Sequence, residues 1–376
     1  MHVSSFPVFT LASTFLLLTP AHAALPRTLR QPVQQLRAVG PEGMNHAAAA
    51  AAWRKVAAAP PSILPDILAA MDGANDYALN WLRTAAESID QRARHEASML
   101  PLKPLEAFLR DTQHHPRARH LAFQIIARAD PSAPERILPS LVNDPSNDLR
   151  RDAVDRLVQL AATAAAQDKQ RGVEHYEAAL AHAREADQID AIAKRLADMG
   201  RKVDLQQVFG WVTRWQLAGP FDNTGGAGFN TAFPPESGFN SEARFDGKKG
   251  PVRWIESTTQ NEYGLVDFNK PFGSLKEVTG YAHAEFWAPT DRTAEIRLGC
   301  KNGWKVWVNG KLLFGRDEYH RNMEIDQYRL PFQLKAGRND ILVKCCQNEQ
   351  TEDWTKEWEF QLRVTDPQGS PIRPTR

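Results

Sequence analysis

The residue pattern of this chain changes near Lys202, and the change constrains the fold more than any other feature of the sequence. From Met44 to Gly200, alanine-rich stretches carry apolar residues at helical spacing, with prolines between them. After Lys202, Gly, Phe, Trp and β-branched residues dominate, and short runs alternate between apolar and polar residues as strands do. We therefore expect a multidomain α + β protein in which helices come first and an antiparallel β-sandwich follows.

The expected segments follow from this change. They are a signal peptide at 1–23, a linker at 24–43, a helical-repeat domain at 44–201, a β-sandwich domain at 202–366 and a C-terminal tail at 367–376. Eight of the ten tryptophans lie after Lys202. Because aromatic side chains dominate many protein cores, we expect them to mark one aromatic-rich sandwich.

The first 23 residues have the pattern of a signal peptide. They contain no Lys, Arg, Asp or Glu, and the apolar run from Phe9 to Leu18 precedes the small-residue site Ala21-His22-Ala23. The alternative is an N-terminal membrane anchor, but the run is shorter than the roughly 18 apolar residues that span a bilayer. We expect an exported chain, periplasmic or extracellular, whose mature form has no membrane anchor.

The helical half contains a repeat. Three residues recur at a constant offset of 31 positions: Arg119, Ala122 and Ile126 match Arg150, Ala153 and Leu157. A helix pair with this period predicts an α-solenoid. The stretch from Asp144 to Val154 resembles a HEAT repeat, in which an Asp-Pro turn leads into a helix with Arg and Ala at the packing seam. Because stacked helix pairs leave a concave face, we expect a protein-docking surface or a spacer.

The second half contains a clear hairpin signal. Asn309-Gly310 separates the strand patterns Trp304–Val308 and Lys311–Phe314. Both residues of such a turn need positive φ, which Asn and Gly tolerate best. Several further strand patterns with turn residues between them favour an antiparallel sandwich.

Two segments in this half carry a family resemblance. Trp307–Lys311 and Leu334–Lys344 resemble the galactose-binding-like jelly roll, and the similarity runs from Trp215 to Val364. The whole layout, including the segment Trp215–Asn223, also resembles exported planctomycete proteins that join HEAT-like helical repeats to this sandwich. That combined family implies no settled activity.

The resemblance implies that the sandwich binds carbohydrate, through loops at one end or a face of the sheet. Aromatic rings stack on sugar rings, while Asp, Asn and Arg bond the hydroxyl groups. The candidate residues lie in or beside loops: Trp304, Asp317, Tyr319, Arg321 and Trp354. The alternative is that the tryptophans fill the core, which we favour for Trp215, Trp287 and Trp358 and leave open for Trp304 and Trp354.

The long loop from Gly219 to Glu236 permits two interpretations. Asp222, Asn223 and Glu236 could supply oxygen ligands to a structural calcium ion, which sandwiches of this type often hold. The alternative, which we favour, is a glycine-rich cover that packs Phe221, Phe229 and Phe233 onto the sheet. No other cofactor is expected.

The three cysteines also permit two interpretations. Cys300 ends one expected strand and Cys345-Cys346 ends another, so a disulfide from Cys300 to one of them, such as Cys345, is feasible. Adjacent residues of a strand point to opposite faces, so only one of the pair can face Cys300. Equally, all three could be buried free thiols.

Composition and motifs narrow the function without fixing it. Lys and Arg number 46 against 45 Asp and Glu, a balance that does not favour nucleic-acid binding. No H-E-x-x-H, G-x-S-x-G or C-x-x-C-H motif occurs, so the sequence favours a non-enzyme. We expect a non-catalytic binding protein with carbohydrate and protein partners. The alternatives are an exported glycan-active hydrolase, or an accessory subunit of one, and a structural or assembly protein of the cell envelope.

Overall fold

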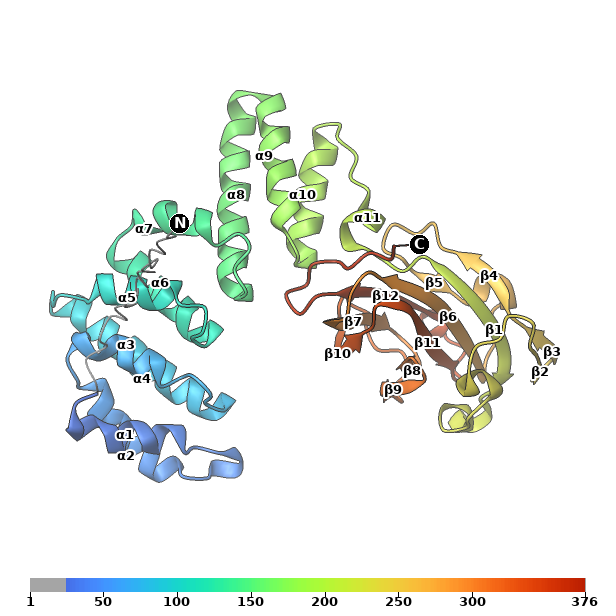
Figure 1. Cartoon of the computed structure of the whole chain (residues 1–376), viewed down its shortest axis with the longest axis horizontal. Helices are drawn as coiled ribbons and strands as arrows, with labels where there is room; N and C mark the ends of the chain where they lie inside the picture. The colour runs from blue at the N-terminus through green and yellow to red at the C-terminus, as the bar shows by residue number, and fades with distance from the viewer. Residues whose placement is uncertain (1–24, 376) are drawn as a thin grey trace, which may run out of the picture. The chain divides into compact units, whose positions relative to one another are not determined.

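A computed structural model describes residues 25–375, so the predicted signal peptide lies outside the described residues. The chain divides between Pro139 and Ser140 into two compact units. The first is helical, and the second contains four further helices and then the strands, drawn from yellow to red in Figure 1. No helix in the described range is long and apolar enough to cross a membrane.

The first unit consists of helices joined by short turns. They are α1 (Arg27–Arg37), α2 (His46–Ala57), α3 (Leu64–Ala69), α4 (Asp76–His95), α5 (Leu102–Arg110), α6 (Pro116–Ala129) and α7 (Ala133–Ile137). Local signals set their starts: the Asn75 side chain accepts a hydrogen bond from the Ala78 amide, and Pro116 opens α6. Helix α1 lies in the predicted linker, and it packs through Leu29, Val33 and Leu36 despite the internal proline Pro32.

Four helices open the second unit: α8 (Asn147–Gln167), α9 (Lys169–His182), α10 (Ala186–Asp198) and α11 (Leu205–Phe209). Helices α8 and α9 lie side by side (Figure 1). A Cβ atom on Gly172 would lie 2.4 Å from Cβ of Ala165, so glycine is required for this approach. These four helices belong to the same compact unit as the strands. The domain boundary predicted at residue 201 instead follows the change in the sequence from helical to strand-like patterns.

The strands form two sheets and a small hairpin, in which every neighbouring pair is antiparallel. The strands are β1 (Arg214–Asp222), β2 (Arg244–Gly247), β3 (Gly250–Arg253), β4 (Ile255–Thr258), β5 (Val266–Asp267), β6 (Val278–Ala288), β7 (Arg292–Cys300), β8 (Gly303–Val308), β9 (Lys311–Arg316), β10 (Tyr328–Leu334), β11 (Gly337–Gln347) and β12 (Glu359–Thr365), with the short helix α12 (Asn269–Phe272) after β5. One sheet has the order β4-β1-β6-β11-β8-β9 and the other β10-β7-β12-β5, while β2 pairs with β3.

The two large sheets face each other across one core. Residues from both sheets form a single buried cluster, among them Trp215 and Phe286 from the six-stranded sheet and Leu298 and Phe360 from the four-stranded sheet. Trp215 and Trp358 are buried in it, as predicted. The predicted hairpin at Asn309-Gly310 joins β8 to β9, with φ of 51° and 75° at these two residues. The predicted order of helices and then antiparallel sheets is therefore confirmed.

The segment predicted as a C-terminal tail is packed against the second unit. The amide of Ile372 donates to the carbonyl of Val364 at 2.9 Å, and the Ile372 side chain is buried. A guanidinium nitrogen of Arg150, in α8, donates to the carbonyl of Gln368 at 2.9 Å. The last residues therefore tie α8 to the end of β12.

The outer face of the six-stranded sheet has its own cover. A second apolar cluster, which includes Tyr281 and Trp307, packs on this face beneath Phe233, Phe239 and Phe245. Lys344, fully buried, fixes the cover, because its ammonium donates to the carbonyls of Phe229 and Thr231 and to the Glu236 carboxylate at 2.7–3.2 Å. The cover leaves the neighbouring part of the face open.

Candidate functional site

The open part of the outer face forms a groove of about 550 Å³. Its side chains come from neighbouring strands in register: Gln216 of β1 lies opposite Glu256 of β4 and His283 of β6. Because directly paired residues point to the same side of a sheet, these three side chains share one face. Glu285 of β6 and its partner Asp340 of β11 continue the row.

His283 lies at the base of this groove and is held in place by Asp340. The two side chains are joined from Nε2 to Oδ1 at 2.9 Å, and Asp340 also accepts from the Arg338 guanidinium at 2.7 Å. The ring of Phe239 stacks on His283 with centroids 3.7 Å apart. Burial lowers the pKa of His283 below its ordinary value despite the carboxylate, so the imidazole is neutral near pH 7. The groove therefore has a rigid, prearranged floor.

Trp287 supplies the aromatic wall of the groove. Trp287 is paired with Arg338 and lies two residues after Glu285 along β6, on the same face of the sheet. Its side chain is half-buried and lines the groove. The prediction that Trp287 fills the core is therefore wrong. Its neighbours Phe286 and Ala288 take the core positions, because side chains alternate between the faces of a strand.

The groove combines groups that suit a polyhydroxylated ligand. Carboxylates, an amide and a guanidinium give both acceptors and donors, and a Gln216 amide hydrogen bond to Glu256 at 3.4 Å leaves both side chains capacity for further bonds. A half-exposed indole beside them offers an apolar face. Sequence reasoning missed these residues, although the alternation of His283 and Glu285 with Ala282, Ala284 and Phe286 indicated an outward polar row.

The carbohydrate residues predicted from the sequence do not share one cleft. Trp304 is only 1% exposed and packs in the core against Tyr328, with ring centroids 4.7 Å apart. It cannot stack on a ligand, so its place in the predicted site is wrong. The reason is that β8 begins at Gly303, which makes Trp304 an inward strand residue instead of a loop residue.

The other predicted residues remain near the surface. Trp354 is 61% exposed and meets the ring of His320 edge-on at 5.4 Å. The Tyr319 hydroxyl accepts a hydrogen bond from the Asn223 amide at 3.1 Å, while Asp317 and Arg321 are exposed. They form an open loop surface without the hydrogen-bonded floor of the groove.

Two of the three predicted calcium ligands, Asp222 and Glu236, pair with lysines, whereas the buried side-chain oxygen of Asn223 has no hydrogen-bond partner among the described residues. Asp222 pairs with Lys248 at 2.9 Å, and hydrogen bonds from Thr224 and Lys248 hold the pKa of Asp222 below its ordinary value. Glu236 pairs with Lys344 at 2.8 Å. Within residues 25–375, no group of three or more His, Cys, Asp or Glu side chains is placed to hold a metal. Phe221 and Phe229, within the segment 219–236, are buried, as the alternative interpretation predicted.

Because Asp222 and Glu236 are held in ion pairs with lysines, we expect calcium to have little effect on stability. A ligand that binds only the folded state raises the melting temperature, so a melting curve in 2 mM calcium can be compared with one in EDTA. We expect the two to agree within about 1 °C. A rise of several degrees that is lost in an Asp222→Asn variant would establish the predicted site instead.

The three cysteines are buried. Cys300, at the end of β7, and Cys345, in β11, point into the core from opposite sheets, with their sulfur atoms 3.8 Å apart. Cys346 points to the other face, where its sulfur lies 3.4 Å from the Thr279 hydroxyl. The structure thus brings together the pair named from the sequence, and the disulfide itself stays a prediction.

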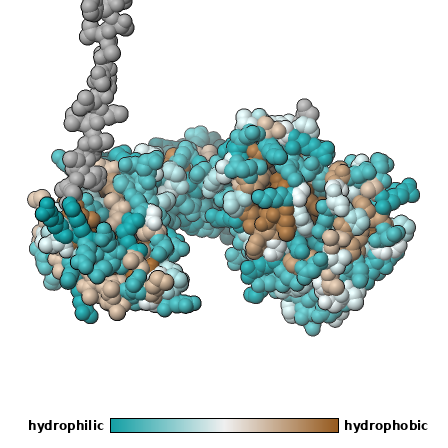
Figure 2. Space-filling model, turned by 60° about the horizontal axis from the view of Figure 1, so that its bottom comes forward, coloured by the Kyte–Doolittle hydropathy of each residue, from teal (hydrophilic) through white to brown (hydrophobic). Residues whose placement is uncertain are grey.

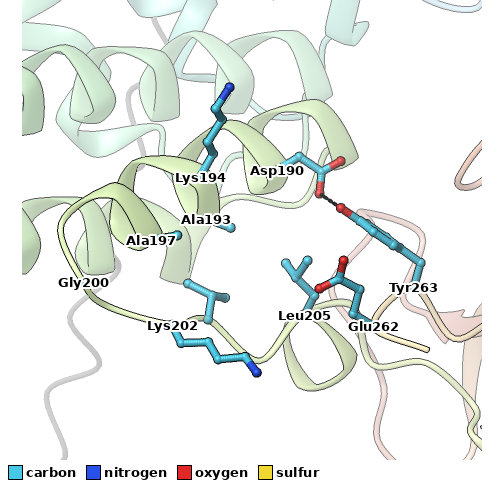
Figure 3. Close-up of a pocket in the computed structure, with 10 residues that line it drawn as sticks. Asp190, Ala193, Lys194, Ala197, Gly200, Lys202, Leu205, Glu262 and Tyr263 are labelled. Carbon is cyan, nitrogen blue, oxygen red and sulfur yellow. Dashed lines mark hydrogen bonds between the residues drawn. The ribbon is translucent and has the colours of Figure 1, made fainter. Parts of the chain in front are cut away.

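A second hollow, of about 500 Å³, lies beside α10 and α11 (Figure 3). Its apolar floor includes Ala193, Ala197 and Leu205, and the carboxylate of Glu262 faces it. The Tyr263 hydroxyl donates to Asp190 at 3.4 Å. Burial raises the pKa of Asp190, and the negative charge of Glu262 adds to this shift. This hollow has fewer polar groups than the groove on the sheet.

Comparison with known proteins gives no functional assignment. No protein-family model and no curated protein matches the chain. Structures it resembles include an anti-sigma factor domain-containing protein from Clostridium clariflavum, at 13% identity and a TM-score of 0.26, covering 44% of this chain and 45% of that one. An FMN-binding beta-glucuronidase from Facaelibacterium prausnitzii L2-6 has 16% sequence identity and a TM-score of 0.23. The match covers 40% of this chain and 21% of that one.

A third resemblance covers more of the chain. The alkylpurine DNA glycosylase AlkC of Pseudomonas fluorescens, bound to DNA with an abasic site analogue, has 13% identity and a TM-score of 0.22 over 91% of this chain and 94% of that one. The chain spans less than half the length of the first two structures. At such TM-scores none of these similarities supports a conclusion about function.

Proposed function

We propose that this chain is an exported, non-catalytic binding protein whose β-sandwich binds carbohydrate in the groove on the outer face of the six-stranded sheet. The row of Gln216, Glu256, His283 and Glu285 beside Trp287, in which Asp340 holds His283 in place, carries the proposal. Protein sites that bind sugars need hydrogen-bonding groups fixed before the ligand arrives, because ordering them on binding costs affinity. The network around Asp340 provides that order.

The finer features of the sequence resemblance belong to the same proposal. We propose a galactose-binding-like jelly roll for the sheets and HEAT-like repeats, used as a docking surface or spacer, for the helices. The equivalent arginines support the repeat, since both are buried: Arg119 donates to the carbonyl of Leu109 at 2.8 Å and Arg150 to that of Asp144 at 3.0 Å.

Binding to a glycan array, followed by titration of the best glycan, tests the groove. We expect Trp287→Ala and Glu256→Gln each to weaken binding about tenfold or more, which corresponds to about 1.4 kcal/mol. Trp354→Ala is the matched control, because it removes an exposed tryptophan from the loop surface. If Trp354→Ala abolished binding and Trp287→Ala did not, the ligand would bind the loop surface, and if no glycan bound, the proposal would fail.

One observation favours a second candidate, a glycan hydrolase acting in the hollow beside α10. Glycoside hydrolysis uses one carboxyl group that stays protonated and one that is ionised. Asp190, whose pKa is raised, and Glu262 both line this hollow. Release of reducing sugar that is lost in Asp190→Asn and in Glu262→Gln would support hydrolysis, whereas glycan binding without turnover would exclude it for the glycans tested.

A further inference from the structure

One edge of the sandwich exposes apolar side chains. Strand β9 is the last strand of the six-stranded sheet. Leu312 and Phe314 on this strand are 45% and 43% exposed, two of the few large apolar side chains exposed in the described part of the chain. Figure 2 shows apolar side chains gathered in a patch on the surface of the sandwich. Such patches commonly mark interaction sites.

A pocket of about 440 Å³ adjoins this edge. Its apolar lining comes from both sheets, with Val308 and Leu313 on one side and Pro331 and Phe332 on the other. Its rim is polar and lacks any carboxylate: Thr293, Asn309, Lys311, Gln333 and Lys335. The two lysines are exposed, and no ion pair involving either is found among residues 25–375. The pocket is therefore apolar inside and positively charged at its rim.

The edge itself is suited to accept another strand. A strand at the end of a sheet has unpaired backbone groups along one side, and an extended peptide can add there. Strand β9 contains no proline. A bulge opposite Val306 and Trp307 leaves Leu313 as the extra residue, and Leu313 packs against the core. Leu312, paired with Trp307, lies on the outer face, and Phe314, paired with the core residue Val306, lies on the opposite face. Each is nearly half exposed beside the edge and can contact an added strand.

The charges of β9 decide which strand can add. Antiparallel pairing with a second copy of β9, centred on the strand, would place Lys311 opposite Arg316 at both ends, and like charges opposite each other are unfavourable. Glu318 already pairs with Arg316 at 2.8 Å, which leaves Lys311 and the nearby Lys335 to attract negative charge. An acidic strand fits this edge better than a second copy does.

We propose that the β9 edge and the adjoining pocket bind an extended segment of a partner protein in which apolar residues alternate with acidic ones. The segment adds antiparallel or parallel to β9, one apolar side chain fills the pocket, and its carboxylates lie near Lys311 and Lys335. The proposal is independent of carbohydrate binding, because the strands that line the groove are β1, β4 and β6.

Fluorescence anisotropy with labelled ten-residue peptides tests this surface. One probe is a peptide of alternating Val and Glu, and the other is a peptide of alternating Val and Lys. The receptor is the full-length protein. We expect the acidic peptide to bind at least tenfold more tightly than the basic one. We expect the double variant Lys311→Glu/Lys335→Glu to lose at least tenfold in affinity for the acidic peptide and to gain affinity for the basic peptide.

Two further variants keep the result interpretable. Lys249→Glu, at an exposed position in the β2–β3 turn, should leave peptide binding unchanged. Leu312→Lys should weaken peptide binding without changing the melting temperature, because the side chain is half exposed. Equal affinity for both peptides, or no binding of either, would overturn the proposal. So would a concentration-dependent dimer that Leu312→Lys dissociates, since the edge would then bind a second copy.

Discussion

Asp326→Asn is expected to lower the free energy of unfolding of the second unit by about 3–5 kcal/mol, because it leaves two buried guanidinium groups without their shared carboxylate. The side chain of Asp326 is only 6% exposed and lies between Arg297 and Arg363, which are themselves buried. Arg363 donates from Nε to Oδ1 at 2.7 Å, and Arg297 donates from Nη1 to Oδ2 at 2.8 Å. Urea or guanidinium denaturation curves measure the loss.

The same carboxylate makes the stability depend on acid. Burial raises the pKa of Asp326, but hydrogen bonds and charges from Arg363 and Arg297 outweigh it and hold the pKa below its ordinary value. A carboxyl group whose pKa is lower in the folded state stabilises that state above its unfolded pKa, and the contribution disappears as pH falls through the folded pKa. We therefore expect wild type to lose more stability than Asp326→Asn as the pH falls below about 4.

Glu324→Gln is the matched control for this prediction. Glu324 lies two positions away in the same loop, but it is exposed and its side chain has no ion pair among the described residues. We expect it to change the free energy of unfolding by less than about 0.5 kcal/mol. Equal effects of the two substitutions would show that charge in the loop matters and that the buried pairing does not.

The sequence predicted the layers of this fold better than it predicted the faces of individual strands. The Asn309-Gly310 turn and the alternating runs around it were sufficient to place β8 and β9. Alternation shows which residues share a face, yet it does not show which face another sheet covers. For this reason Trp304, named as a candidate binding residue, lies in the core, and Trp287, expected in the core, lines the groove.

The groove could not be predicted for a related reason. Gln216, Glu256, His283 and Asp340 come from four strands, and only the register of those strands brings them together. The order β4-β1-β6-β11 joins strands that are distant in sequence, and nothing in a single sequence gives this order. The polar row on β6 was visible, but its partners were not.

Refolding in an oxidising thiol buffer is expected to join Cys300 to Cys345 and to raise the free energy of unfolding by about 2–4 kcal/mol. The two thiols would lose two protons and two electrons to oxidised glutathione, which is released as two reduced molecules. Burial, with a contribution from the Cys300 hydrogen bond, raises the pKa of the Cys345 thiol well above its ordinary value. The reactive thiolate is therefore scarce in the folded state, and the bond should form during folding and only slowly afterwards.

Cys346 provides the internal control. Its side chain points to the opposite face of β11, so a bond from Cys300 to Cys346 would require the strand to turn over. Peptide mapping of the refolded protein should find Cys300 linked to Cys345 and Cys346 free, and Cys346→Ser should keep both the bond and the added stability. Three free thiols after oxidative refolding, or a bond to Cys346, would contradict the prediction. The first result would identify all three as buried free thiols whose sulfur atoms contribute to stability only through packing.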